Sequence, residues 1–314
     1  MVKRILLIQE LYPEQLEDLK EVATDYEVVE SLEDTDPSTI EIILGWSDDL
    51  VSFIESDDCN VKWVQYPYAG VNLLPLETFA KKNILLTNGS GITANSVAET
   101  TIGLLLGMTR KIVQSASNQK IASWDRGDDA YELSDKTILI VGAGQIGVQV
   151  GRIAKAFNMH TIGINRSGRP IENMDEQYVQ TELEEVIHKA DIIVNILPLT
   201  KETTHLYDKN LFEKMKNGVI FINVGRGESV VTDDLIEALD QGKVSRAGLD
   251  VFEEEPLAAG HPLWKHDQVL MTPHIAGQVE SYPKHVYPIF KKNLEAFLKG
   301  EELPQNQIEL NAGY

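Results

Sequence analysis

The feature that most constrains this chain is a glycine-rich turn between a short apolar run and an amphipathic stretch. Residues 137–141 are Thr-Ile-Leu-Ile-Val, a β-branched run typical of a strand buried on both faces. Gly142, Gly144 and Gly147 follow in the pattern Gly-x-Gly-x-x-Gly, and apolar residues then recur at helical spacing as far as Phe157. A strand, a glycine turn and a helix in this order predict a dinucleotide-binding unit of a parallel sheet. The alternative is a structural glycine turn in another α/β unit.

Each glycine of this turn has a separate physical reason. Gly142 permits the sharp turn after the strand, Gly144 lets the backbone approach a pyrophosphate, and Gly147 lets the helix pack closely on the strand. Gln145 and Ile146 lie between the second and third glycines. We therefore expect these five residues to bind the cofactor, with the anion at the helix N-terminus.

Length and charge limit the partners of the chain. With 314 residues, the chain is long enough for about two domains, each with its own core. Its formal charge of -21 argues against a nucleic acid or an acidic lipid surface as a partner, because a polyanion would be repelled. An anionic substrate would have to be held by locally placed cations.

Three further features argue against a disulfide-bonded, secreted, membrane-spanning or metal-binding protein. Cys59 is the single cysteine, so an internal disulfide is impossible and a reducing compartment is expected. The apolar run at the N-terminus is too short for a signal peptide, and no segment approaches the ~18 apolar residues of a membrane span. The histidines show no paired spacing of metal ligands. We expect a cytoplasmic protein without a metal site.

Apolar runs alternate with amphipathic segments along most of the chain. This alternation predicts parallel sheets covered by helices on both faces, first in about the first hundred residues and again from residue 137. The expected strands are residues 3–8, 26–30, 40–45, 61–66, 84–87, 137–141, 161–164, 191–196, 219–223, 246–251 and 269–271. The expected helices include residues 13–22, 49–56, 76–81, 146–157, 183–188, 210–215 and 287–298, with a further helix from about residue 233.

A longer helix is expected between the two sheets. Ser96-Val-Ala-Glu99 has the pattern of a capping box, with Ser96 as N-cap and Glu99 reaching back to it. The apolar positions that follow continue as far as Ile112 and Val113, which is more than one buried face needs. This pattern favours an element between domains or between subunits. A central core helix is the alternative.

Polar groups that could carry chemistry follow three successive strands of the second sheet. They are Arg226, one of the glutamates 253–255, and His274. Ligands of open parallel sheets bind beyond the carboxyl ends of the strands, so we expect these side chains to meet. Taken singly, Arg226 could cap a helix, the glutamates could form a solvated turn, and His274 could be a core histidine.

Taken together, these motifs resemble the D-isomer-specific 2-hydroxyacid dehydrogenases along nearly the whole chain. The glycine turn is followed by Asn-Val-Gly-Arg-Gly at residues 223–227, Leu-Asp-Val-Phe-Glu-Glu-Glu-Pro at 249–256 and Thr-Pro-His-Ile at 272–275. Shorter matching motifs lie at residues 68–72, 96–99, 197–200 and 261–264.

The resemblance implies a two-domain α/β fold. A Rossmann domain with a doubly wound parallel sheet, residues 101–284, is inserted into a flavodoxin-like α/β substrate domain, residues 1–100 plus 285–314. Closure of the two domains would exclude water from the substrate. Members of this family usually dimerise through the coenzyme domain, so we expect a homodimer.

The resemblance also implies a role for each candidate catalytic residue. Arg226 would bind the carboxylate and the 2-oxo oxygen of the substrate, a planar task that suits a guanidinium. His274 would be the general acid that protonates this oxygen, and Glu255 would orient His274 and favour its charged form. Backbone N–H groups of Gly70 and Val71 would hold the substrate carboxylate from the other domain.

Further residues would bind the cofactor by the same resemblance. Asp250 would meet the carboxamide of the nicotinamide. The remaining cofactor-binding residues of the Rossmann domain would be Leu197, Pro198, Val224 and Gly277, together with residues of the turn at 165–167.

That turn departs from the commoner pattern and bears on cofactor choice. Members that prefer NAD carry Asp or Glu at the end of the second Rossmann strand, where the carboxylate binds the ribose hydroxyls. This chain has Asn165, followed by Arg166, Ser167 and, two residues on, Arg169. Without the carboxylate, a 2′-phosphate is not repelled and Arg166 can pair with it. We expect NADP(H) to be preferred, with NAD(H) possible; otherwise these arginines are surface cations.

The leading hypothesis is a reductase that makes D-2-hydroxy acids from small 2-oxo acids such as glyoxylate or hydroxypyruvate. One alternative is an NAD-dependent dehydrogenase of the D-3-phosphoglycerate type. Another is a non-enzymatic, cofactor-sensing protein like the corepressors built on this fold. The loops around residues 46–48, 66–72 and 278–287 are expected to select the substrate side chain.

Overall fold

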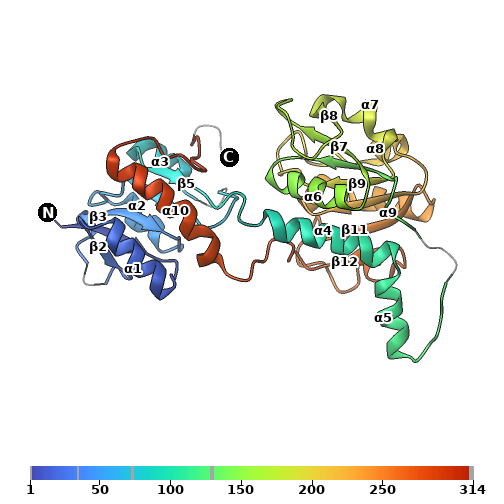
Figure 1. Ribbon diagram of the computed structural model, residues 1–314, viewed down its shortest axis with the longest axis horizontal. Helices are drawn as coiled ribbons and strands as arrows, with labels where there is room; N and C mark the ends of the chain where they lie inside the picture. Colours follow the sequence, from blue (N-terminus) through green and yellow to red (C-terminus); the bar gives the residue numbers. More distant parts are fainter. Residues whose placement is uncertain (1, 34, 72–73, 128–130, 311–314) are drawn as a thin grey trace. The chain divides into compact units, whose positions relative to one another are not determined.

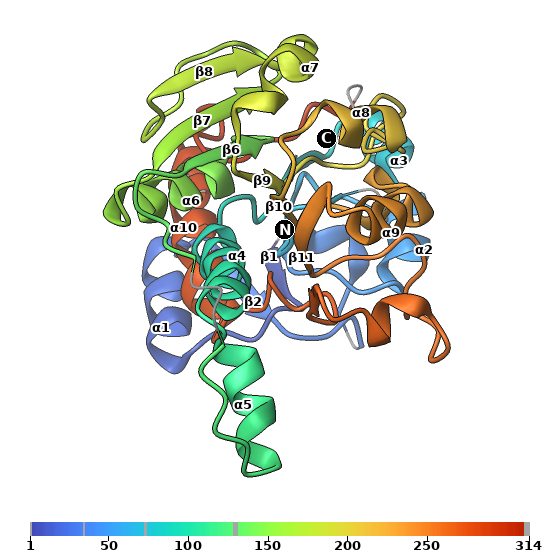
Figure 2. The ribbon, with the colours of Figure 1, turned by 90° about the vertical axis from the view of Figure 1, so that its right-hand side faces the viewer.

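The computed structural model describes residues 2–33, 35–71, 74–127 and 131–310. The chain divides into two compact units, each with its own parallel sheet (Figures 1 and 2). Unit 1 comprises Met1–Ile92 and Val279–Tyr314, and unit 2 comprises Thr93–Gln278. Asn72 of the expected substrate loop lies outside the described residues.

The boundaries between the two units fall eight and six residues before the expected domain boundaries. The expected divisions at residues 100/101 and 284/285 lie inside helices α4 (Ala94–Thr109) and α10 (Tyr282–Lys299). The units separate just before each helix begins, because α4 packs on α6 and β11 of unit 2, whereas α10 packs on α1 of unit 1.

Unit 1 has a parallel sheet with the strand order β2-β1-β3-β4-β5. This is the order of flavodoxin-like sheets, in which the chain reverses direction across the sheet next to β1. The strands are β1 (Lys3–Leu7), β2 (Tyr26–Val29), β3 (Ile40–Leu44), β4 (Trp63–Gln65) and β5 (Leu85–Thr87), and the helices besides α10 are α1 (Pro13–Val22), α2 (Leu50–Glu55) and α3 (Leu76–Lys82).

The last helix completes the core of unit 1. Trp63 of β4 is fully buried, and its indole stacks on Phe290 of α10 with ring centroids 5.0 Å apart. The indole nitrogen also donates a hydrogen bond to Thr87 Oγ1 at 2.8 Å. These contacts hold the C-terminal helix against the sheet formed by the N-terminal residues.

Unit 2 has a parallel sheet with the order β12-β11-β10-β9-β6-β7-β8, which reverses at β6 as in Rossmann folds. The predicted fold class, a Rossmann sheet together with a flavodoxin-like one, is confirmed. The strands are β6 (Thr137–Val141), β7 (His160–Asn165), β8 (Glu176–Val179), β9 (Ile192–Asn195), β10 (Val219–Asn223), β11 (Val244–Leu249) and β12 (Val269–Met271). The helices besides α4 are α5 (Ile112–Lys120), α6 (Gln145–Ala156), α7 (Leu183–Val186), α8 (Lys209–Lys214) and α9 (Thr232–Asp240).

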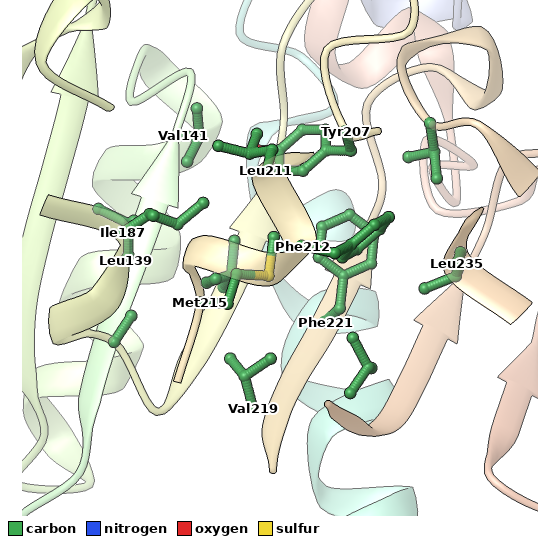
Figure 3. Close-up of a cluster of buried hydrophobic side chains, with 14 of the residues drawn as sticks. Leu139, Val141, Ile187, Tyr207, Leu211, Phe212, Met215, Val219, Phe221 and Leu235 are labelled. Carbon is green, nitrogen blue, oxygen red and sulfur yellow. The ribbon is translucent and has the colours of Figure 1, made fainter. Parts of the chain in front are cut away.

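An aromatic cluster supports the central strands of unit 2 (Figure 3). Phe221 of β10 lies against Tyr207 and Phe212, with ring centroids 5.0 and 5.6 Å away. All three side chains are buried, and burial raises the pKa of Tyr207 above its ordinary value. The backbone of Tyr207 also bonds to Ser229 and Val231, so the cluster fixes the turn that follows β10.

The structure corrects the expected start and end of the long helix. The predicted capping box is wrong: α4 begins at Ala94 with Thr93 as N-cap, and the Ser96 hydroxyl donates to the Thr93 carbonyl instead. The helix ends at Thr109 because Lys111 takes a left-handed conformation, with φ +55°. The expected continuation is therefore a separate helix, α5.

Two other elements differ from the expectation. The edge strand β8 was not predicted, and it pairs with β7 alone. The last helix begins at Tyr282 rather than at residue 287, because Ser281 accepts a hydrogen bond from the Lys284 N–H and caps it. Among the described residues, no helix combines the length and the apolar character needed to cross a bilayer.

Candidate active site

The glycine turn after β6 has the geometry of a phosphate-binding turn. Gly142 has φ +92°, and a Cβ there would lie 2.9 Å from the backbone of Ile196 and Leu197. By contrast, a Cβ on Gly144 would have no heavy atom within 4 Å, so the space in front of this residue is open. The turn is therefore tight on the side of β9 and accessible on the side where a ligand would bind.

The first turn of α6 presents N–H groups to this open space. The first hydrogen bond within the helix runs from the Val148 N–H to the Gly144 carbonyl, so the N–H groups of Gln145, Ile146 and Gly147 precede it. Such groups, together with the helix dipole, stabilise an anion. The turn therefore fits the pyrophosphate of a nicotinamide dinucleotide.

The turn after β7 is organised by Asn165. Its side-chain amide donates to the Arg169 carbonyl at 2.8 Å and accepts from the Gly168 N–H at 2.6 Å. The pKa of Glu202, in the loop after β9, is lowered mainly by a hydrogen bond from Thr200, and the positive charge of Arg166 adds to this effect. Arg166 is thus close enough to Glu202 to influence its pKa.

A buried polar network holds the backbone of Arg226. The Arg226 carbonyl accepts hydrogen bonds from Ser229 Oγ at 2.6 Å and from Asn223 Nδ2 at 3.1 Å. Asn195 Nδ2 in turn donates to Ser229 Oγ and to Asn223 Oδ1, at 2.7 and 3.0 Å. All three partners are buried. These residues were not predicted, although polar residues at the ends of buried strands were the available signal.

Two glycines let the Arg226 turn lie directly against neighbouring backbone. A Cβ on Gly225 would be 2.7 Å from the Leu197 carbonyl oxygen. A Cβ on Gly227 would be 1.8 Å from the Phe252 carbonyl oxygen and 1.9 Å from its carbon. The Arg226 turn therefore packs against the segment that carries the glutamates 253–255.

Replacement of Gly227 by Ala is expected to lower the free energy of unfolding by about 3 kcal/mol, the upper end of the usual cost of overpacking. The new methyl group would displace backbone, which cannot rotate away as a side chain can. Urea unfolding of both proteins measures the difference. Gly260→Ala is the matched control, since a Cβ there meets no atom within 4 Å. A Gly227→Ala protein as stable as its parent would contradict the prediction.

Glu255 and His274 form a hydrogen-bonded pair. His274 Nδ1 lies 2.6 Å from Glu255 Oε2, and the other oxygen of Glu255 accepts from the Phe252 N–H at 2.9 Å. Both carboxylate oxygens of Glu255 thus accept hydrogen bonds. Because Nδ1 of His274 is bound to Glu255, Nε2 is the ring nitrogen that can contact a ligand. Of the other glutamates, Glu253 accepts from the Thr232 N–H at 2.8 Å and lies 3.2 Å from His205.

Asp250 organises the loop that carries His274. This carboxylate is buried and accepts hydrogen bonds from Thr272 Oγ1, the Ile275 N–H and the Ala276 N–H, at 2.6, 2.9 and 3.0 Å. The His274 N–H donates to the Asp250 carbonyl at 2.8 Å, and His274 has φ +53°. A non-glycine residue in this conformation needs such support, so Asp250 holds the strained loop in place.

A pocket of about 180 Å³ brings the three candidate catalytic residues together. Arg226, Glu255 and His274 line it, and Glu228, Phe252 and Glu253 also contribute to its walls. All of these residues belong to unit 2. The pocket therefore combines a guanidinium, which suits a carboxylate, with an imidazole that can exchange a proton.

The other expected site residues are distributed over both units. Gly70 and Val71 lie in unit 1 in the loop after β4, whereas Leu197, Pro198, Val224 and Gly277 lie in unit 2 beyond the carboxyl ends of β9, β10 and β12. The part of the chain that the structure describes contains no group of three His, Cys, Asp or Glu side chains arranged to hold a metal ion.

A doubly wound sheet with a phosphate-binding glycine turn, in a unit that also carries an acid–base pair, is typical of a nicotinamide-dependent oxidoreductase. Residues 102–276 match the family model of the D-isomer specific 2-hydroxyacid dehydrogenase, NAD binding domain. The chain belongs to the family of D-isomer-specific 2-hydroxyacid dehydrogenases.

Individual relatives agree with this assignment. The glyoxylate reductase of Thermofilum pendens is 35% identical over 251 residues, which are 78% of this chain and 74% of the relative. The D-3-phosphoglycerate dehydrogenase of Methanocaldococcus jannaschii is 32% identical over 99% of this chain, which spans 60% of that protein. The structure of an NADPH-dependent glyoxylate/hydroxypyruvate reductase from Sinorhizobium meliloti, in complex with NADP and sulfate, matches with a TM-score of 0.78 and 28% identity, over 99% of this chain and 100% of that one.

Proposed function

We propose that this protein is a cytoplasmic, NADPH-dependent reductase that converts a small 2-oxo acid of the glyoxylate or hydroxypyruvate type into a D-2-hydroxy acid. The observation that carries the proposal is the pocket in which Arg226 lies beside the hydrogen-bonded pair of Glu255 and His274. The kinship with glyoxylate and hydroxypyruvate reductases supports the substrate class.

In this proposal Arg226 binds the substrate carboxylate and polarises the 2-oxo group through charge-assisted hydrogen bonds. His274 Nε2 donates a proton to the oxygen of C2 and accepts it in the reverse reaction. Glu255 orients the imidazole through Nδ1 and favours its charged form. The nicotinamide, when bound, supplies the hydride that C2 receives.

The remaining residues position the reactants. Backbone N–H groups of Gly70 and Val71 bind the substrate carboxylate. Asp250 keeps the loop of His274 in place and has capacity for one further hydrogen bond, which we assign to the nicotinamide carboxamide, because a carboxylate has about four acceptor positions and three are used.

The cofactor preference rests on the turn after β7. Asn165 is neutral and uses its amide to close the turn, so residue 165 itself brings no carboxylate that would repel a 2′-phosphate. Arg166 and Ser167 follow directly and supply a positive charge and a hydroxyl donor. The relative from Sinorhizobium meliloti, which is named as NADPH-dependent, supports this preference.

Replacement of Asn165 by Asp is expected to lower the ratio of kcat/KM for NADPH to that for NADH by about 10- to 100-fold. A carboxylate would repel the 2′-phosphate and accept hydrogen bonds from the ribose hydroxyls of NADH, and contacts of this kind are worth roughly 1.5–3 kcal/mol. Steady-state kinetics with both cofactors measures the ratio. Asn173→Asp is the control, because Asn173 lies beside Thr161 near the start of β7, whereas the turn follows the end of this strand. A parent protein that prefers NADH would refute the assignment.

The function itself is tested by turnover. Purified protein is incubated with NADPH and either glyoxylate or hydroxypyruvate, and oxidation of the cofactor is followed by its absorbance. Chiral analysis of the product should show the D-hydroxy acid. Binding of NADPH without turnover of any 2-oxo acid would favour the cofactor-sensing alternative.

The phosphoglycerate alternative has one observation in its favour, the kinship with the enzyme of Methanocaldococcus jannaschii. Oxidation of D-3-phosphoglycerate with NAD is therefore assayed beside the reductase reaction. A kcat/KM for this substrate above that for glyoxylate and hydroxypyruvate would select the alternative.

We also propose that the protein forms a homodimer through α4, α5 and residues 121–127. None of the residues of α5 is buried, and the helix projects from unit 2 (Figures 1 and 2). Ile112 of the helix is 56% exposed, and Trp124, which follows the helix, is 91% exposed. Exposed apolar patches of this kind mark surfaces that associate.

Replacement of Trp124 by Ser is expected to shift the protein from dimer to monomer at micromolar concentration. Loss of a large aromatic anchor typically costs at least about 2 kcal/mol of binding, or ~30-fold in Kd. Sedimentation velocity over a dilution series measures the equilibrium. Trp264→Ser, which changes another exposed indole of unit 2, is the control. A parent protein that is monomeric throughout the series would contradict the proposal.

A further inference from the structure

The pocket around Arg226 has an excess of negative charge. Of the residues that line it, Glu228, Glu253 and Glu255 are carboxylates, whereas Arg226 is the permanent cation. Glu255 is paired with His274, and Glu253 is engaged by Thr232 and His205. These contacts leave Glu228 as the carboxylate most able to act on a ligand.

Glu228 lies next to the anion-binding guanidinium. It is separated from Arg226 by Gly227 alone, and both side chains are exposed while Gly227 is buried. Its backbone is fixed, because the His205 N–H donates to the Glu228 carbonyl at 2.8 Å. A substrate whose carboxylate pairs with Arg226 therefore binds next to the residue that carries this negative charge.

A second anionic group on the substrate would find no second permanent cation in the described part of this pocket, since His274 is already engaged by Glu255. Among the described residues that line it, there is no lysine and no other arginine. A phosphate or a second carboxylate would be repelled by Glu228 rather than paired. Because Glu228 is exposed, this repulsion acts at short range and should weaken as salt is added.

In unit 1, considered by itself, the turns at the carboxyl ends of the strands also carry negative charge. In the described residues, the turns that directly follow β1, β3, β4 and β5 contain Glu10, Asp48 and Asp49 and no lysine or arginine. Ligands of parallel sheets bind at such carboxyl ends. The first lysine or arginine of unit 1 after β5 is Lys284, which is exposed in the first turn of α10.

We infer that this site accepts 2-oxo acids whose only anionic group is the carboxylate, and that Glu228 is the residue that rejects a second anion. Uncharged and cationic substrate side chains are accepted, whereas phosphorylated and dicarboxylic 2-oxo acids are excluded. The inference rests on the proposed reductase function and names its substrate class.

The test compares substrates in pairs of similar shape that differ in charge. With NADPH in excess, kcat/KM is measured for hydroxypyruvate against 3-phosphohydroxypyruvate, and for 2-oxopentanoate against 2-oxoglutarate. The monoanion is expected to be preferred at least ~50-fold in each pair, and the ratio should fall as sodium chloride is added, because salt screens the repulsion.

Variants identify the residue responsible. Glu228→Gln is expected to lower each ratio at least ~5-fold, and Glu228→Lys by a further ~5-fold. The control is Glu254→Gln, which removes the same charge from an exposed glutamate outside the pocket and should leave the ratios unchanged. Because each ratio is taken within one protein, a partly misfolded variant still gives a valid comparison.

The outcomes separate this inference from the proposed function. Absence of turnover with every 2-oxo acid would overturn the function. Turnover that favours the dianions, or ratios that Glu228→Gln leaves unchanged, would overturn the inference alone. Turnover of dianions that disappears in Lys284→Gln would also overturn it, because the second anion would then be bound from unit 1.

Discussion

Replacement of His274 by Asn is expected to lower kcat for 2-oxo acid reduction by about 10²–10⁴-fold, the usual contribution of a general acid. The loss follows because Nε2 of His274 is the proton donor in the proposed mechanism, with Nδ1 bound to Glu255 at 2.6 Å. Asn is preferable to Ala here, since His274 has φ +53° and Asn tolerates this left-handed conformation. The affinity for NADPH should change little, because the phosphate-binding turn is untouched.

Steady-state kinetics and a fluorescence titration with NADPH measure the two quantities separately. His205→Asn is a close control, because His205 also has φ +53° and also lies beside a glutamate, Glu253. We expect kcat of the control to stay within about threefold of the parent. A His274→Asn protein with kcat within tenfold of the parent would show that another group supplies the proton.

Replacement of Arg226 by Gln is expected to lower kcat/KM by about 10²–10⁴-fold. Arg226 makes two proposed charge-assisted contacts, with the carboxylate and with the 2-oxo oxygen, each worth roughly 1.5–3 kcal/mol. Arg226→Lys should recover only part of this loss, since an ammonium cannot make the planar, two-pronged contact. Both variants should retain the fold, because the buried network binds the backbone carbonyl of residue 226, whereas the guanidinium donates locally, to the carbonyl of the adjacent Gly225 at 2.7 Å.

The kinetics are read with the substrate concentration varied at saturating NADPH. Arg152→Gln, on the exposed face of α6, removes an equal charge away from the pocket and serves as the control. If Arg226→Gln weakened NADPH binding and left kcat/KM for the oxo acid within fivefold, the residue would belong to the cofactor site instead.

The fold class could be predicted because the central strands are continuous apolar runs. All residues of β10, for example, are buried, and a short apolar run of this kind fits few structures other than a strand in the middle of a sheet. β8 was missed because it is an edge strand of polar and aromatic residues, Glu-Gln-Tyr-Val, that is only partly buried. Its place in the sheet comes from pairing with β7, which no local pattern announces.

Helix ends were the least predictable part of the fold. Ser96 and Glu99 satisfy the capping pattern, yet α4 begins two residues before Ser96. The left-handed conformation of Lys111 has no sequence signal, since it is neither Gly nor Asn. Ser281 does carry a capping signal, and it shows that α10 should have been expected five residues earlier.

Within the candidate site, the positions of the candidate catalytic residues could be predicted, but the hydrogen bonds that support them could not. That Arg226, Glu255 and His274 follow three successive strands is evident from the order of apolar runs. These strands, β10, β11 and β12, lie side by side in the parallel sheet, which agrees with the presence of the three residues in one pocket. The hydrogen bonds of Asn195, Asn223 and Asp250 depend on the register of strands far apart in the chain. Local sequence patterns do not contain this register.

Unit 1 is made of two segments far apart in the chain, which has a consequence for its synthesis. Its sheet leaves the ribosome first, but Phe290, which stacks on Trp63, is made only after the whole of unit 2. At translation rates of about 5–20 residues per second, roughly 10–40 s separate Ile92 from Val279. During this interval the apolar side chains that α10 covers in the finished unit, Trp63 among them, lack that cover, and a chaperone could bind the nascent chain there.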